Sequence, residues 1–139
     1  MFLDELNSRQ KSSFLALITR VVLADGDVAP EEDAVLLRLK NTLGEGVVAP
    51  PEEVFGVTNV AVFPTRRLRL VTFLELLVSA HADEKIHPDE STVLAEVAGA
   101  FELDETIVEK LTEWVRRFVI SAEAEKPGLK AEAESLIDG

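Results

Sequence analysis

Residues 24–32, ADGDVAPEE, and residues 82–90, ADEKIHPDE, align without a gap and decide the fold. In both stretches an Asp follows an Ala, a Pro stands five positions after that Asp, and a Glu follows two positions later. The shared frame continues with matched apolar residues: Leu36 with Leu94, Leu39 with Val97, and Leu43 with Phe101. Proline is favoured at the first position of a helix, so each copy predicts a helix, a tight corner and a proline-started helix.

The rest of the chain also predicts helices, because apolar residues recur at a spacing of three and four. The predicted helices cover residues 8–24, 30–43, 66–82, 88–101, and a stretch that starts after Asp104. The helix at 66–82 is apolar over most of its circumference, which places it in the centre of a bundle. No long alternation typical of strands is present. We predict one all-α domain over residues 1–139, with six to seven helices and pseudo-symmetric helical hairpins in the halves at about 10–45 and 66–103.

Two segments are less regular. Residues 44–64 read as a long connection, with a short helix opening at Pro51 and coil or a helical turn at 60–63. Residues 123–139 carry few apolar anchors, so they predict either a docked C-terminal helix or a frayed tail.

Two further features have a structural interpretation. Arg66, Arg67 and Arg69 form a basic cluster in an acidic chain, and we expect them to face solvent or pair with acids of the same chain. Trp114 lies on the apolar stripe of its predicted helix, so we expect it in the core.

Composition excludes several classes of function. The 139 residues carry a formal net charge of −12, which repels phosphate backbones, so we expect no nucleic-acid partner. Cysteine is absent, which rules out thiolate ligands and a cysteine nucleophile. The most apolar stretches are interrupted by charge, so we expect no insertion into a membrane and a cytoplasmic location.

The acids that both corners share are the main candidate site. Asp25 and Asp83 fall at predicted helix C-termini, where the helix dipole disfavours a carboxylate by about 0.3–1 kcal/mol. Local hydrogen bonds to nearby backbone N–H groups are one compensation, and Glu32 and Glu90 are placed to bond back to the helix start. A divalent cation held by these four carboxylates would also offset the unfavourable dipole. The same carboxylates can make local hydrogen bonds and bind a cation. The secondary candidate ligands are Asp27, Glu31, Asp89, His81 and His87.

Other motifs at the corners fit less well. An EF-hand fails on spacing, because Pro30 and Leu36 stand where that loop requires Gly and Glu. His81 and His87 suit a transition metal, but the first copy has Leu and Ala at the matching positions. The His-Pro-Asp tripeptide at 87–89 is the signature of J-domain co-chaperones, but it lies in the wrong context and aligns with a helix start.

The first corner, Ala24 to Glu32, resembles the corner motif of the tellurite-resistance TerB-like domains, and the resemblance spans about residues 10–122. The second corner keeps Asp83 and Glu90 but has Glu84 where that family usually has Gly. The resemblance implies a bacterial cytoplasmic protein with two related helical halves and no enzymatic activity. It also implies a stress-response role, divalent-metal binding by acidic residues, and partners in membrane-associated complexes. Related domains in membrane-anchored J-domain co-chaperones serve as accessory interaction modules.

These observations lead to three functional hypotheses. The first is a non-enzymatic acidic helical domain that binds a divalent cation in a tellurite or stress response. The second is a helical protein-interaction module whose repeated acidic corners are purely structural. The third, a metal-dependent hydrolase, requires clustered carboxylates with an open coordination position and a substrate cleft.

Overall fold

A computed structural model describes residues 2–24, 37, 40–44, 46–56, 58–81 and 88–138, with the backbone alone at 88–90. Six α-helices are described: α1 (Ser8–Leu23), α3 (Pro51–Val54), α4 (Arg66–Ala80), α5 (Pro88–Ala100), α6 (Glu105–Ile120) and α7 (Lys126–Asp138). Three 3-10 turns accompany them: η1 (Leu3–Glu5), η2 (Val60–Val62) and η3 (Glu123–Glu125). These residues contain no strand, which confirms the all-α class.

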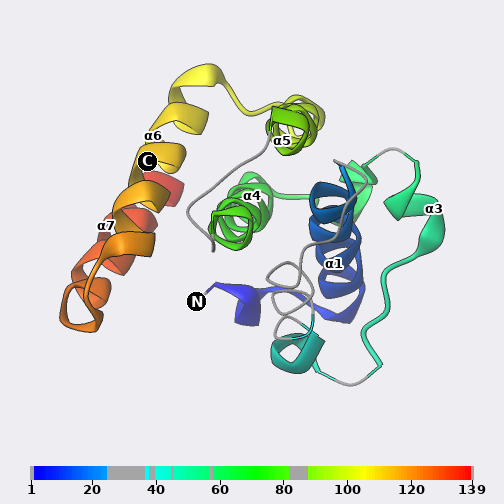
Figure 1. Ribbon diagram of the computed structural model, residues 1–139, viewed down its shortest axis with the longest axis horizontal. Coiled ribbons are helices and arrows are strands. Elements are labelled where there is room, and N and C mark those ends of the chain that lie inside the picture. The colour runs from blue at the N-terminus through cyan, green and yellow to red at the C-terminus, as the bar shows by residue number, and fades with distance from the viewer. Residues whose placement is uncertain are drawn as a thin grey trace.

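Helix α4 is the centre of the bundle, as its sequence predicts. Its residues from Leu70 to Leu77 are all buried, so this stretch has no solvent-facing side. Helix α4 contacts α1, α5, α6, α7 and η1. In Figure 1 it lies between α1 on one side and the α6–α7 pair on the other.

One apolar cluster joins the elements from η1 to α7. Its largest fully buried side chains include Phe14, Phe63, Phe101 and Trp114. The rings of Phe63 and Phe101 meet edge to face, with centroids 5.5 Å apart, so the connection before α4 is packed against the end of α5. No helix in the part of the chain that the structure describes has the length and apolar character needed to cross a membrane.

Polar side chains start the helices where the sequence predicts them. The side chain of Asn7 accepts from the backbone N–H of Gln10, and the Gln10 side chain bonds back to the Asn7 N–H, forming a capping box at α1. Thr65 caps α4, and the carboxylate of Asp104 caps α6 by accepting from Ile107 N–H at 2.8 Å. These bonds satisfy backbone donors that the helices leave free.

The less regular segments resolve into helical turns. Helix α3 begins at Pro51, and η2 shows that the helical turn, rather than coil, is the correct alternative of the two predicted at 60–63. The C-terminal segment is a docked helix, with Ala133 and Ile137 buried. Trp114 is fully buried and donates its indole N–H to the carbonyl of Leu129 on α7 at 2.7 Å. The predicted helix at 30–43 lies largely outside the described residues, so the symmetry of the two halves stays a prediction.

Helix α5 ends with a left-handed residue that is not glycine. Glu102 has φ +59°, and the N–H of Leu103 bonds to the carbonyl of Ala98 at 3.0 Å, as in a Schellman motif. We expect Glu102→Gly to raise the free energy of unfolding by about 0.5–1 kcal/mol, because glycine adopts this conformation without a Cβ clash. Urea denaturation checks this, with Glu102→Gln as the control that keeps the strain. A less stable glycine variant would contradict the prediction.

Candidate functional site

The two predicted acidic corners follow α1 and α4. Asp25, Asp27, Glu31, Glu32, Asp83 and His87 lie outside the described residues. Asp89 and Glu90 are described for the backbone alone, as the second and third residues of α5. The start of α5 at Pro88 matches the predicted helix start and places Glu90 in the first turn of the helix.

His81 is the one candidate ligand whose side chain the structure describes. It follows the last residue of α4, and its backbone N–H donates to the carbonyl of Leu77 at 3.0 Å. Its ring Nδ1 lies 2.8 Å from the same carbonyl oxygen, so Nδ1 carries the proton and donates. His81 therefore completes the end of α4, and only its Nε2 is left to accept a bond or bind a metal.

The helices that lead into the corners pack together. Helix α1 contacts both α4 and α5. In the last turn of α1, the guanidinium of Arg20 donates to Thr58 at 3.1 Å and to Glu96 of α5 at 3.2 Å. Val22 at the end of α1 and Ala80 at the end of α4 are buried, at 5% and 8% exposure. Both corners are thus entered from helix ends that are anchored in the core.

Metal-binding geometry is absent from the residues whose side chains are described. Among them, no three His, Asp or Glu side chains come together in a way that would hold a metal ion. The predicted cation site concerns the corners themselves and stays a prediction.

The structure reveals a buried polar network between α1 and α3 that the sequence did not signal. Glu53 is 7% exposed and accepts from the Ser13 hydroxyl at 2.6 Å and from the Arg9 guanidinium at 2.8 Å. The guanidinium also donates to the Ser13 oxygen at 2.7 Å. All three residues bond one another, so the network fixes α3 on α1. Glu53 follows Glu52 in the sequence, and nothing in the pattern marks which of the two acids is buried.

A second buried acid lies on the central helix. Glu75 is 5% exposed, and its carboxylate accepts from the backbone N–H of Phe2 at 2.8 Å. The Phe2 ring is itself 2% exposed, so the N-terminal segment packs into the bundle against α4.

The basic cluster pairs within the chain, in accordance with one of the two expectations. Arg67 binds the carboxylates of Glu5, Glu134 and Asp138. Its hydrogen bonds to Glu5 and then Glu134 hold the pKa of its guanidinium above the usual value. Arg69 donates to the carbonyl of Phe63 at 2.9 Å. Arg66 is exposed.

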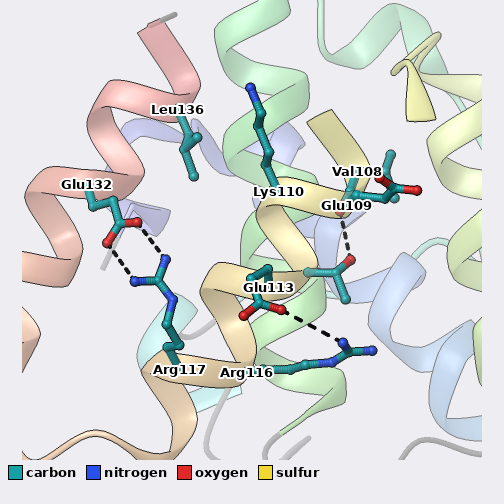
Figure 2. A pocket seen from close by; sticks show the side chains of 9 residues that line it. Val108, Glu109, Lys110, Glu113, Arg116, Arg117, Glu132 and Leu136 are labelled. Atoms are coloured by element: carbon teal, nitrogen blue, oxygen red, sulfur yellow. Dashed lines mark hydrogen bonds and ion pairs between the residues drawn. The ribbon is translucent and has the colours of Figure 1, made fainter. Parts of the chain in front are cut away.

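Shallow hollows line the seam between α6 and α7. Figure 2 shows the one of about 540 Å³, with Arg117 of α6 turned toward Glu132 of α7. The hydrogen bonds of this pair lower the pKa of Glu132 and raise that of Arg117. Arg116 and Glu113 pair along α6 at 4.0 Å. The cations in this hollow are matched by acids, so it lacks the charge excess that would favour an ionic ligand.

Comparisons with known proteins give no relative. No protein-family model, no curated protein and no solved structure matches this chain.

Proposed function

We propose that this chain is a non-enzymatic acidic helical domain that binds a divalent cation at its repeated corners. The observation that carries the proposal is the shared register of Asp25 with Asp83 and of Glu32 with Glu90. Carboxylate oxygens are the ligands that calcium and magnesium prefer, and a cation would offset the unfavourable placement of an Asp at a helix C-terminus. The net charge of −12 also favours cations over anions.

The surroundings of the corners support this proposal. Val22 in the last turn of α1 and Ala80 at the end of α4 are buried, and Glu90 stands in the first turn of α5. Anchored helix ends reduce the conformational entropy that is lost when corner carboxylates gather around an ion. The resemblance to the TerB-like domains extends the proposal to a bacterial cytoplasmic protein in a stress or tellurite response, with a protein partner in a membrane-associated complex.

Cation titration tests the site directly. We expect calorimetry with calcium, magnesium, manganese and zinc to show binding by the unaltered chain. The double variant Asp25→Asn/Asp83→Asn should weaken it at least about 10-fold, which corresponds to 1.4 kcal/mol. The control Glu52→Gln/Glu109→Gln removes the same charge from exposed side chains of α3 and α6 and should change the affinity less than about 3-fold. Equal affinity in the Asn variant and the control would refute the site.

A helical interaction module with purely structural corners is the second candidate. The observation in its favour is Phe55, which is 83% exposed directly after α3, the helix that Glu53 fixes on α1. Val48, in the same connection, is 69% exposed. If no cation binds and Asp25→Asn/Asp83→Asn only lowers the melting temperature, this second function replaces the first.

A further inference from the structure

The C-terminal helix suggests an interaction surface unrelated to the corners. We propose that α7 is displaceable, and that the surface beneath it on α4 and α6 binds an acidic amphipathic helix of another protein. We call this surface the α7 seat and define it by Arg67 of α4 and by Trp114, Arg117 and Phe118 of α6. The proposal does not depend on cation binding.

The apolar anchoring of α7 is thin. Ala133 and Ile137 are its only buried residues, and Leu129 and Leu136 are partly buried. Apolar stabilisation grows with the apolar area removed from water, and α4 buries every residue from Leu70 to Leu77, so α7 has far less of it than α4. A helix with few buried contacts opens at a free energy below that of global unfolding.

Ion pairs near the surface supply much of the remaining attachment. Arg67 binds Glu134 at 3.1 Å and Asp138 at 2.7 Å, and Arg117 binds Glu132. All five side chains are at least 36% exposed. Exposed pairs of this kind contribute little to stability, and their contribution weakens as salt rises.

Shallow surface hollows also follow the seam between α6 and α7. Hollows of about 540, 670 and 470 Å³ border it. Leu136 lines the first and the third, and Leu129 lines the second. Figure 2 shows the first hollow open beside the Arg117–Glu132 pair. These hollows are shallow and lie along the surface edge of the seam, where a displacing helix with larger side chains would find room.

The α7 seat is strongly apolar at its centre. Trp114 is fully buried, and its ring stacks on Phe118 with centroids 4.9 Å apart. The indole N–H requires an acceptor, which the carbonyl of Leu129 now supplies. An empty seat would expose both rings to water, which is unfavourable. Displacement of α7 is therefore favoured only when another helix covers the seat.

The contacts of α7 define what such a helix must carry. Two small or aliphatic residues four apart, as at Ala133 and Ile137, fit the apolar centre. Acids on either side, as at Glu132, Glu134 and Asp138, satisfy the guanidiniums of Arg67 and Arg117. An acidic amphipathic helix meets both conditions, which is the helix-in-groove mode of recognition.

Hydrogen exchange on the full chain tests the displacement. We expect the amides of α7 to be less protected than those of α4. Exchange of the α7 amides should accelerate as sodium chloride rises from about 50 to about 500 mM, because salt screens the surface pairs.

The variant Glu132→Gln/Glu134→Gln should accelerate α7 exchange about 3- to 10-fold, as expected for the loss of surface ion pairs. The matched control Glu52→Gln/Glu96→Gln removes the same charge from exposed side chains of α3 and α5 and should leave α7 exchange unchanged. Equal protection of α7 and α4 at every salt concentration would overturn the proposal.

A peptide with the sequence of residues 123–138 tests the occupant. The full-chain variant Ile137→Asp weakens its own α7, so we expect it to bind this peptide at least about 10-fold more tightly than the unaltered chain does. A peptide with Gln at 132 and 134 and Asn at 138 should bind more weakly. If Ile137→Asp fails to fold, Glu132→Gln/Glu134→Gln replaces it. Three outcomes would overturn the partner assignment. They are equal affinity for the acidic and the neutralised peptide, no binding of either peptide, and a dimer of the chain that excludes the peptide.

Discussion

Leu74→Ala is expected to lower the free energy of unfolding by about 3–5 kcal/mol, the largest effect we predict for a single substitution. Leu74 is fully buried in α4, the helix that contacts α1, α5, α6, α7 and η1. Packed side chains surround Leu74 on every side and cannot move far. The cavity left by the truncated side chain therefore stays largely unfilled. Urea denaturation followed by far-ultraviolet circular dichroism measures the change.

A surface deletion serves as the control for this experiment. Val48→Ala removes methyl groups from a side chain that is 69% exposed, so it should change the free energy of unfolding by less than about 0.5 kcal/mol. A loss below about 1 kcal/mol for Leu74→Ala would mean that α4 is not the centre of the core.

The second large effect is expected at the network between α1 and α3. Glu53→Ala removes the acceptor of the Ser13 hydroxyl and one of the two acceptors of the Arg9 guanidinium, so it should destabilise the fold by about 2–3 kcal/mol. The value lies below that of a fully buried pair because the Arg9 side chain is 49% exposed and regains water. Calorimetric melting gives the loss of stability, and a double-mutant cycle with Arg9→Ala isolates the Arg9–Glu53 coupling.

Glu52 provides the matched comparison. It precedes Glu53 in α3 but is exposed, so Glu52→Ala should change stability by less than about 0.5 kcal/mol. Similar losses at the two positions would indicate a general effect of charge on α3, and would contradict the role assigned to the buried carboxylate.

The central helix was predictable because its pattern has one physical solution. A helix that is apolar over most of its circumference must be surrounded by other elements, and α4 is buried in this way. The helix starts at Asn7, Thr65 and Asp104 follow the same logic, because short polar side chains satisfy free backbone donors. The ends were less predictable: α4 stops at Ala80 and not at about 82, with His81 completing its last turn.

The polar contacts could not be predicted. Glu75 bonds to the backbone of Phe2 across 73 positions, and Glu53 bonds to Ser13 across 40. Such pairs depend on how helices meet in space, and periodicity describes each helix alone. The corner acids are the opposite case. Their repeated register is visible in the sequence, but six of the nine candidate ligands lie outside the residues that the structure describes.

The bonds of Arg67 have a consequence for chain topology. One guanidinium holds Glu5 of the first turn and Asp138 of the last helix, so the described chain returns nearly to its starting point. Terminal positions that lie this close suit circular permutation. A permuted chain, joined near Glu5 and Asp138 by a short glycine-serine linker and opened at the exposed Gly46 beside Val47, would keep each helix in the described part of the chain bounded as it is here.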